Sequence, residues 1–235
     1  MAERPDVDEL TIEECPSNEG IIIIATVNRP EKLNALNLAV KEAIKSLCTW
    51  AQDSEKVRVI VFKGASPPPP PEGKRQKPHA FVAGADVSEF VGKDSVAIRP
   101  EFEDNVWEAV WKLRKPTIAL IDGYALGGGS ELALSCDIRI ATKRSMFGTP
   151  EINLGLIPGG GGTQRLTWLV GYGKAMEMIM GGEMIDGQEA YRIGMVNHIV
   201  EPDDLLSKGM EIATNLASKS PLTIQIAKQS VRTAL

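Results

Sequence analysis

The sequence predicts one α/β domain, on the basis of three observations. Short apolar runs that are typical of strands alternate with segments whose apolar residues recur at helical spacing. Two of the predicted strands end in a glycine turn that leads into a helical segment, one at Gly84 and one at Gly127 to Gly129. The chain has 235 residues, enough to bury a substantial core in one large domain or in a domain with a small helical appendage.

Composition narrows the class of protein. The 26 basic and 31 acidic residues give a net charge of −5, which does not favour a broad nucleic-acid surface. The three cysteines are widely spaced and lack metal-ligand spacing, so we expect a reduced compartment and no metal site. Residues 1–10 are acidic and lack an apolar core, and no apolar run approaches the ~18 residues of a membrane helix. These features predict a cytoplasmic protein with no membrane partner.

The first elements begin an antiparallel sheet. Residues 10–14 and 21–27 are β-branched runs separated by turn formers, which predicts a hairpin. Asn37 is a candidate N-cap for a helix, and residues 57–62 are a candidate strand. The predicted buried face of that helix consists of Val40, Ile44, Leu47, Cys48 and Ala51.

A proline-rich insert occupies residues 65–79. It contains five consecutive prolines, residues 67–71, followed by polar residues with nothing to bury, so an exposed extended loop is expected. Its basic cluster of Lys74, Arg75 and Lys77 is either a solvated surface or a group that attracts a phosphate-bearing ligand.

Residues 80–90 form a short predicted strand, a glycine at Gly84 and a segment of helical character. A helix is predicted from Arg99 to Arg114, ended by Pro116. Trp107 and Trp111 share one face of it, where an aromatic stripe is either core or the wall of an acyl pocket.

The glycine turn after residues 117–121 is the candidate functional centre. Glycines let a ligand approach the backbone closely, and the first N–H groups of a helix have no intrahelical partner, so the turn can hold an oxyanion. Glu131 follows in the first helical turn, where a carboxylate would add acid–base chemistry. The structural alternative is a glutamate that only complements the helix dipole beside tightly packed glycines.

The remaining elements continue the alternation. Residues 137–141 are a predicted strand, and residues 147–166 a loop that carries a second carboxylate, Glu151, and a glycine run. Beyond Trp168 the pattern is mainly helical, with one strand at 196–200. The predicted helices there are 175–180, 187–193, 203–218 and 222–235.

Four blocks of this sequence resemble the crotonase, or enoyl-CoA hydratase, family. They are residues 28–36, 80–90, 115–134 and 147–166. They occur in the family's order, span nearly the whole chain and include both glutamates, which makes the resemblance specific. It implies a crotonase-like spiral of repeated ββα units over residues 1–170 and a C-terminal helical trimerisation region over 171–235. A homo-oligomer, either a trimer or a dimer of trimers, is therefore expected.

Two departures from the family's pattern stand out. The insert at 65–79 is longer than the usual connection and directly precedes an oxyanion strand. The helical region 171–235 is shorter than usual.

The resemblance also implies a site. The backbone N–H groups of Ala85 and Gly128 match the family's oxyanion hole for an acyl-CoA thioester, and Glu131 and Glu151 match its two catalytic glutamates. Gly159 matches the position whose N–H helps to place the attacking water. The expected contacts to coenzyme A and the acyl group are Lys32, Leu33, Ala35, Ala83, Ala85, Asp86, Val87 and Gly128.

The reaction implied is the reversible hydration of a 2-enoyl-CoA, with Glu131 activating water and Glu151 protonating C2. No cofactor is expected besides the coenzyme A of the substrate, and a short substrate such as crotonyl-CoA or 3-hydroxypropionyl-CoA is the working guess. Family isomerases need only one carboxylate, at the position of Glu151. Family decarboxylases and hydrolases have other residues in place of one or both glutamates, so the presence of both favours hydration or dehydration. A non-catalytic RNA-binding member is the other alternative, for which Lys41 and Lys45 are a thin basis.

Overall fold

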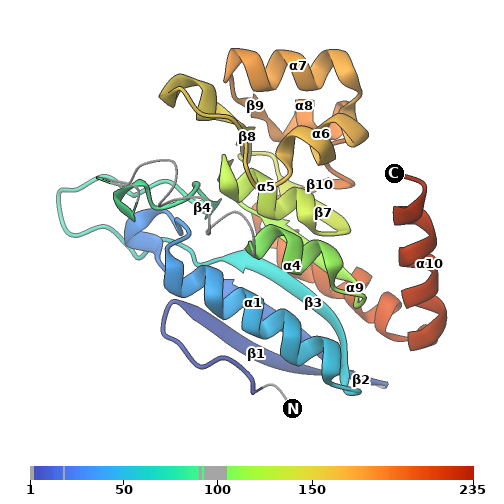
Figure 1. Cartoon of the computed structure of the whole chain (residues 1–235). Coiled ribbons are helices and arrows are strands. Elements are labelled where there is room, and N and C mark those ends of the chain that lie inside the picture. The colour runs from blue at the N-terminus through green and yellow to red at the C-terminus, as the bar shows by residue number, and fades with distance from the viewer. Residues whose placement is uncertain (1–2, 18, 90–91, 93–104) are drawn as a thin grey trace.

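The computed structural model describes residues 3–17, 19–89, 92 and 105–235, and arranges them as two β-sheets surrounded by helices (Figure 1). The strands of the six-stranded sheet are, in spatial order, β1 (Leu10–Ser17), β2 (Gly20–Val27), β3 (Val57–Gly64), β5 (Thr117–Ile121), β7 (Ile138–Thr142) and β10 (His198–Val200). Those of the four-stranded sheet are β4 (Ala80–Val82), β6 (Tyr124–Leu126), β8 (Met146–Gly148) and β9 (Ile185–Asp186).

From β3 to β8, consecutive strands alternate between the two sheets. The pairs β3 and β4, β5 and β6, and β7 and β8 each supply one strand to each sheet, where they run parallel to their counterparts. Helix α5 (Gly128–Ser135) follows the second pair, and helix α6 (Gly162–Val170) follows the third. This is the repeated ββα arrangement expected from the sequence, and it sets the glycine turns of successive units side by side.

The N-terminal elements confirm their predictions. β1 and β2 are antiparallel from the pair Leu10 and Val27 to the pair Ser17 and Gly20, so both strands are longer than the apolar runs suggested. Helix α1 (Leu38–Asp53) begins where the Asn37 side chain accepts a hydrogen bond of 3.0 Å from the Val40 amide. All five apolar residues predicted for its inner face are buried.

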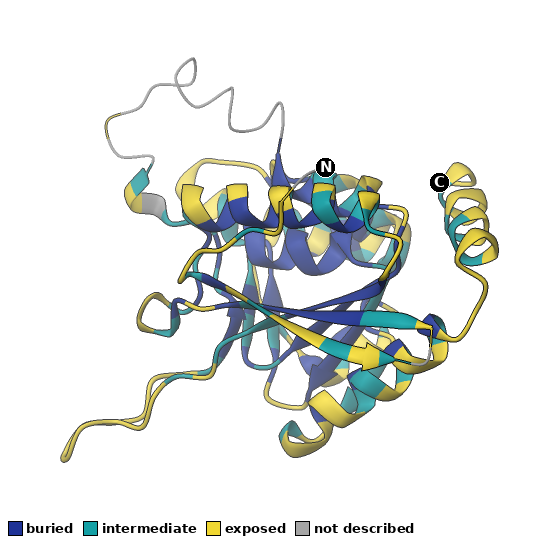
Figure 2. Ribbon diagram, turned by 90° about the horizontal axis from the view of Figure 1, so that it is seen from below, coloured by how far each residue is buried: buried dark blue, intermediate teal, exposed yellow. Residues whose placement is uncertain are grey.

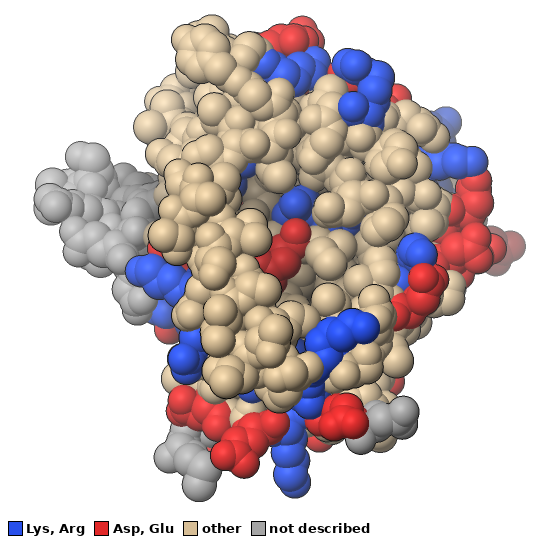
Figure 3. Space-filling view, turned by 90° about the vertical axis from the view of Figure 1, so that its right-hand side faces the viewer, with Lys and Arg blue, Asp and Glu red and all other residues tan. Residues whose placement is uncertain are grey.

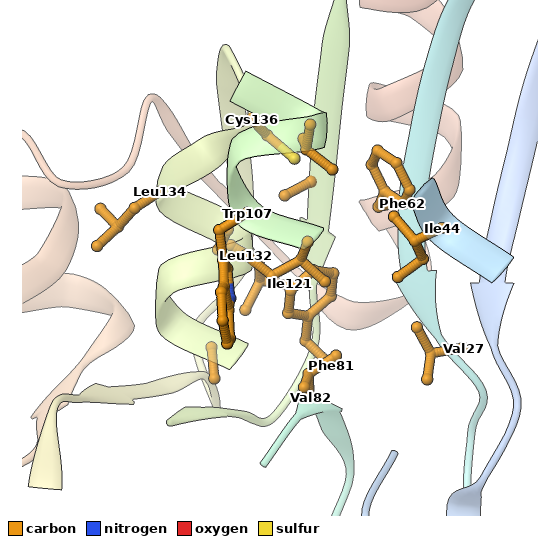
Figure 4. Close-up of a cluster of buried hydrophobic side chains, with 14 of the residues drawn as sticks. Val27, Ile44, Phe62, Phe81, Val82, Trp107, Ile121, Leu132, Leu134 and Cys136 are labelled. Atoms are coloured by element: carbon orange, nitrogen blue, oxygen red, sulfur yellow. The ribbon is translucent and has the colours of Figure 1, made fainter. Parts of the chain in front are cut away.

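The central strands β2, β3, β5 and β7 are buried on both faces, and their alternate residues, which point to opposite sides, belong to two different cores. Ile23 and Ile60 belong to the larger core, which α1 and α5 help to form, and part of this core is drawn in Figure 4. Their neighbours Ile22 and Val59 face helix α9 (Leu205–Ala217) on the opposite side. The buried strands lie between helical layers in Figure 2.

The other helices lie close to their predicted positions. They are α4 (Val106–Lys112), α7 (Tyr172–Gly181), α8 (Gly187–Arg192) and α10 (Pro221–Thr233), with short 3₁₀ turns η1 (Pro30–Lys32), η2 (Val87–Glu89), η3 (Pro150–Leu154) and η4 (Pro202–Asp204). The helix predicted from residue 99 is described only from its cap at Asn105, whose side chain accepts from the Glu108 amide, and residues 99–104 lie outside the described part. It ends at Lys112, two residues earlier than predicted.

The region after residue 170 is not purely helical. β9 joins the four-stranded sheet and β10 joins the six-stranded sheet, while α9 covers one face of the latter. The division of the chain at residue 170 and a role of the second part in trimerisation stay predictions. Within the described ranges, no helix is long and apolar enough to cross a bilayer.

The proline-rich insert projects from the body as a narrow two-limbed arm (Figures 1 and 2). Residues 68–78 are all exposed, as predicted. The chain reverses where the Lys74 amide donates to the Pro71 carbonyl at 3.0 Å, and the Gln76 side chain donates back to the Pro68 carbonyl at 3.1 Å. At its base, the Lys77 ammonium donates to the Glu31 carbonyl at 3.2 Å.

Candidate active site

The glycine turn between β6 and α5 is the centre of the site. Gly127 has φ 50° and ψ −124°, a conformation that residues with a side chain rarely adopt, and its amide donates to the Gly148 carbonyl at 2.9 Å. Gly128 is the first residue of α5, where amides lack intrahelical partners. A Cβ on Gly129 would stand 1.9 Å from the Val82 carbonyl oxygen, so only glycine lets α5 lie this close to β4.

The second turn brings Ala85 to the same place. Leu36 pairs with Ala85 as an isolated parallel bridge: the Leu36 amide donates to Gly84 and the Asp86 amide donates to Leu36, each at 2.8 Å. Because these groups face Leu36, the Ala85 amide is directed to the opposite side. A Cβ placed on Gly128 would lie 3.6 Å from the Ala85 nitrogen, so the two backbone groups predicted from separate blocks are neighbours.

Glu131 lies one helical turn beyond Gly128 and is 2% exposed. Its Oε1 atom accepts two backbone hydrogen bonds from the glycine run before α6, from the Gly160 amide at 2.7 Å and the Gly162 amide at 2.8 Å. Gly159, which the sequence predicted as a water-placing amide, is exposed beside them. The amides that donate to Glu131 are those of Gly160 and Gly162, in the same glycine run as Gly159. A role of the Gly159 amide in placing water stays a prediction.

Glu151 approaches the turn from η3. A Cβ on Gly127 would stand 3.2 Å from its Oε1 atom, and its Oε2 atom is buried without a hydrogen-bond partner among the described residues. The structure therefore brings together four of the five groups to which the resemblance gives a catalytic role, which are Ala85, Gly128, Glu131 and Glu151. They come from three different ββα units.

The two carboxylates are electrostatically coupled. Burial raises the pKa of Glu131 to about 7, the Gly162 and Gly160 amides oppose the rise, the charge of Glu151 adds to it, and Arg165 lowers it. Burial also raises the pKa of Glu151. Because each group affects the other, protons leave the pair in steps that belong to both. A pair of carboxylates with raised pKa values can hold and transfer protons near neutral pH.

Trp107 binds the glycine turn through a hydrogen bond to its backbone. Its indole Nε1 donates to the Gly128 carbonyl at 2.8 Å, and a Cβ on Gly160 would stand 2.3 Å from its ring. The ring is almost fully buried and packs in the core beside α5 (Figure 4). The sequence left open whether Trp107 belongs to the hydrophobic core or to the wall of an acyl pocket. In the structure, Trp107 belongs to the hydrophobic core. It also fixes the spacing between the two glycine segments.

Trp111, one turn further along the same helix, contacts α6 and α10. Its ring lies 5.8 Å from that of Trp168 and lines a cavity of about 410 Å³ between α10 and helices α4 to α6. Figure 3, viewed from the α10 side, shows this face hollowed near its centre, with basic and acidic side chains inside.

The block expected to contact coenzyme A is assembled around Ala83 and Asp86. The Ala83 amide donates to the Leu33 carbonyl at 3.1 Å, which joins β4 to the loop that carries Lys32 and Ala35. Lys32 is exposed, and Leu33 and Ala35 are half-buried. Val87 begins η2, but its side chain lies outside the described part of the structure.

Two residues that sequence reasoning left without a role hold this block together. Asn34 has φ 57°, is buried, and its side-chain amide donates to the carbonyls of Ala65 and Ala80 at 2.9 and 2.7 Å. Arg29 pairs with Asp86 at 3.0 Å, and hydrogen bonds from Ser88 and Arg29 hold the Asp86 pKa below its usual range. An asparagine in a loop was the available signal for Asn34, because asparagine tolerates a left-handed backbone.

No group of three or more histidine, cysteine or acidic side chains that could hold a metal is present among the residues the structure describes. The groups that meet at the glycine turn are two carboxylates and several backbone amides. Together, the ββα spiral and a carboxylate pair beside this turn place the chain in a class of α/β proteins whose geometry suits chemistry next to a polarised carbonyl.

Comparison with known proteins specifies the class. Residues 17–235 match the family model described as enoyl-CoA hydratase/isomerase. A short-chain-enoyl-CoA hydratase of Clostridium acetobutylicum is 39% identical over 215 residues, covering 91% of this chain and 78% of that protein. A crotonyl-CoA hydratase of Syntrophomonas wolfei is 38% identical over 213 residues, covering 89% and 77%.

The solved structure of an enoyl-CoA hydratase from Bacillus anthracis superposes with a TM-score of 0.84 at 34% identity, covering 96% of this chain and 83% of that one. The chain therefore belongs to the enoyl-CoA hydratase/isomerase family. The fold class and the family inferred from the four sequence blocks are confirmed, as is the expectation of an enzyme of this family.

Proposed function

We propose that the protein catalyses the reversible addition of water to a 2-enoyl-CoA, giving a 3-hydroxyacyl-CoA. The observation that carries the proposal is the position of two carboxylates, the buried Glu131 and the half-buried Glu151, at a turn where the backbone groups of Ala85 and Gly128 are neighbours. The names of the relatives support the same reaction.

The backbone amides would stabilise the transition state. Attack of water on C3 of an enoyl thioester moves negative charge onto the thioester oxygen, and two preorganised N–H donors in a dry site lower the energy of that charge. Removing one such donor costs about 3–4 kcal/mol of transition-state stabilisation in enzymes of this kind. Ala85 and Gly128 are the proposed donors, and Trp107 keeps the Gly128 peptide in place through its carbonyl.

The carboxylates would exchange the protons. In hydration, ionised Glu131 takes a proton from water while the water oxygen bonds to C3 of the substrate. Protonated Glu151 delivers a proton to C2. The roles reverse in dehydration. Burial favours the neutral form of both groups, and the charge of Glu151 disfavours ionisation of Glu131, which supports a state near neutral pH in which one carboxyl is ionised and the other is protonated.

The coenzyme A moiety would bind along the block from Lys32 to Ala35 and along the segment from Ala83 to Val87. The exposed ammonium of Lys32 can attract phosphate groups, while Arg29 and Asp86 fix the segment that ends at Ala85. In this mechanism coenzyme A is part of the substrate and no further cofactor takes part. A short acyl chain and a cytoplasmic location remain our working predictions.

We also propose that the protein forms a homo-oligomer, either a trimer or a dimer of trimers. Large apolar side chains are exposed at the end of η3, on the loop that follows it and on α7, which supports association through this face. Those side chains are Leu154, Leu156, Ile157, Tyr172 and Met180.

The first test follows loss of the enoyl-thioester absorbance on mixing the protein with crotonyl-CoA. We expect 3-hydroxybutyryl-CoA to form, and we expect Glu131→Gln and Glu151→Gln each to lower turnover about 10²- to 10⁴-fold, the usual contribution of a positioned acid or base. Binding of the thioester should persist in both variants. Glu211→Gln, which changes an exposed carboxylate on α9, is the matched control.

Wild-type-like turnover in either glutamate variant would refute the mechanism. A product whose double bond has moved, with no hydroxyl group added, would indicate the isomerase alternative. Retention of the protein on RNA at physiological salt without turnover would revive the binding alternative.

A further inference from the structure

Arg165 is a buried cation that connects the glycine run at Glu131 to helix α4. It is 4% exposed, its Nη1 donates to the Gly160 carbonyl, and its Nη2 donates to the Glu108 carboxylate at 2.6 Å. Its guanidinium carbon also lies 4.8 Å from the centre of the Trp111 ring. Arg165 lies in the block 147–166 that resembles the family, but the resemblance assigns no role to this residue.

The carbonyl that Arg165 holds lies between the two amides that hold Glu131. The Gly160 and Gly162 amides both donate to the Glu131 carboxylate, so they point to one side, and the intervening Gly160 carbonyl points to the other side, where it meets Arg165. A Cβ on Gly161, which has φ 90°, would stand 2.1 Å from Nη1. Arg165 therefore packs directly against the glycine segment that carries both donors.

We propose that Arg165 is a positioning residue that holds the Gly160 and Gly162 amides on Glu131, and so fixes this carboxylate for proton transfer. The inference rests on the proposed function and deepens it. Among the described residues, the hydrogen bonds of Arg165 go to the Gly160 carbonyl and the Glu108 carboxylate and not to Glu131, so Arg165 acts on Glu131 through the intervening peptide.

An arginine suits this position because its planar fork can hold two acceptors at once in fixed directions. The two acceptors here belong to different elements, Gly160 in the loop before α6 and Glu108 on α4. A lysine carries the same charge at a single point and cannot reproduce both bonds with the same geometry.

Stability alone does not account for Arg165. Its Nε atom is buried without a hydrogen-bond partner among the described residues, and a buried unpaired donor lowers stability. An apolar side chain of similar length would remove that cost and leave Glu108, which is 40% exposed, accessible to water. We therefore expect Arg165→Met to fold.

The charges around Glu131 set the expected pH behaviour. Glu151 faces it from η3 and raises its pKa, and Arg165 faces it from α6 and lowers its pKa. Glu108 on α4 and Arg232 on α10 act on Arg165 in turn. In Arg165→Met the positive charge is lost, and the Gly160 and Gly162 amides are held less firmly on Glu131. Both changes disfavour ionised Glu131, so the pKa of Glu131 should rise.

The experiment compares Arg165→Met and Arg165→Lys with the wild type in crotonyl-CoA hydration. For Arg165→Met we expect kcat to fall about 10- to 100-fold, the scale of a catalytic group misplaced by roughly 1 Å, with KM changed less than about threefold. The acidic limb of the kcat/KM profile, where Glu131 must ionise, should move to higher pH. Arg165→Lys should keep this limb near its wild-type position but still lose kcat, because only the charge is restored.

The matched control is Arg232→Met. The guanidinium carbon of Arg232 lies 3.8 Å from the centre of the same Trp111 ring, but its hydrogen bond goes to Asp137 and not to the glycine run. Its kcat should stay within about twofold of the wild type, and its pH profile should not shift.

A carboxyl ¹³C NMR titration of Glu131 adds a readout that does not need turnover. An upward shift of the Glu131 pKa in Arg165→Met supports the inference even if crotonyl-CoA is the wrong substrate, so failure of the proposed function is distinguishable from failure of this inference. A folded Arg165→Met protein with an unshifted Glu131 pKa and kcat within twofold would overturn it. If that variant fails to fold, wild-type kcat in Arg165→Lys would overturn it instead.

Discussion

At Glu131, burial and hydrogen bonding act on one carboxylate in opposite directions. Burial favours the neutral acid, while the amides of Gly160 and Gly162 and the charge of Arg165 favour the ionised form, and burial is the largest effect. The result is a pKa of about 7 in the folded protein, against 4.5 for an ordinary glutamate. A carboxylate of this kind exchanges protons readily near neutral pH, but its ionisation lowers the stability of the fold.

Glu131→Gln should therefore gain stability relative to the wild type as pH rises. The folded wild type binds a proton at Glu131 between pH 4.5 and 7 that the unfolded chain releases, so its free energy of unfolding falls across this window, by about 3 kcal/mol in total. Glutamine does not titrate, so the free energy of unfolding of the variant does not fall for this reason. The Tm difference between variant and wild type should grow by roughly 6–12 °C from pH 4.5 to pH 8, measured calorimetrically.

The control for this prediction is Glu211→Gln on the exposed side of α9. Its Tm difference from the wild type should not change systematically with pH. A pH-independent Tm difference for Glu131→Gln would show that Glu131 ionises as easily in the folded protein as in the unfolded chain.

At the scale of an element, none of the residues of helix α10 is fully buried, and one carboxylate outside the helix binds two of its cations. Asp137, just before β7, accepts hydrogen bonds from Arg232 at 2.8 Å and from Lys228 at 2.6 Å. The same carboxylate accepts from the amide and hydroxyl of Thr117 at 2.8 and 3.0 Å. One acidic group thus holds two cations of α10 against β5.

Asp137→Asn should loosen α10 selectively. Asparagine can keep a bond to Thr117, but it leaves the largely buried ammonium of Lys228 and the guanidinium of Arg232 without a counter-ion, at a cost of about 2 kcal/mol or more. Hydrogen exchange in α10 should become faster while exchange in β5 and β7 changes little.

Glu201→Gln is the contrasting variant for this experiment. It breaks an exposed ion pair with Lys143, which contributes at most about 1 kcal/mol. If both variants left exchange in α10 unchanged, the packing of apolar side chains would have to hold the helix in place.

At the scale of the whole molecule, the site is held by a sheet that is buried on both faces, and the proline-rich arm lies outside this framework. Strands β2, β3, β5 and β7 place alternate side chains in two separate cores, so the strand ends that carry the glycine turns cannot shift without disturbing both. The arm between β3 and β4 buries nothing along residues 68–78. Its two limbs are joined near their base by the bond from Gln76 to Pro68.

Replacing residues 68–76 by two glycines should therefore leave the fold intact. A shorter loop costs slightly less closure entropy and no buried contact is lost, so Tm should change by less than about 2 °C. The asparagine bond from Asn34 to Ala65, at the base of the arm, is kept in this variant. A large fall in Tm would mean that the arm packs against the body of the protein.

The same protein tests the basic cluster. If Lys74 and Arg75 attract the phosphates of coenzyme A, KM for crotonyl-CoA should rise in the shortened variant and lose part of its salt dependence. Unchanged KM would assign these residues to the solvated surface.

Much of this molecule could be predicted from local patterns. The hairpin, the cap at Asn37, the strand 117–121 and the exposed arm each depend on a few neighbouring residues, and each was confirmed. Element ends were less accurate, as at Lys112, because helix and strand termini depend on what they pack against. The family could be inferred because four glycine and glutamate blocks kept their order along the chain.

By itself, the sequence determined the alternation of strands and helices, the two glycine turns and the two glutamates, since periodicity and residue type are local properties. Only the tertiary structure decided that the Gly160 and Gly162 amides hold Glu131, that Asn34 bridges two strands, and that Arg165 connects the glycine run to α4. These contacts join residues about 30 to 60 positions apart. They depend on how close separate segments are brought by packing, a distance that no local pattern encodes.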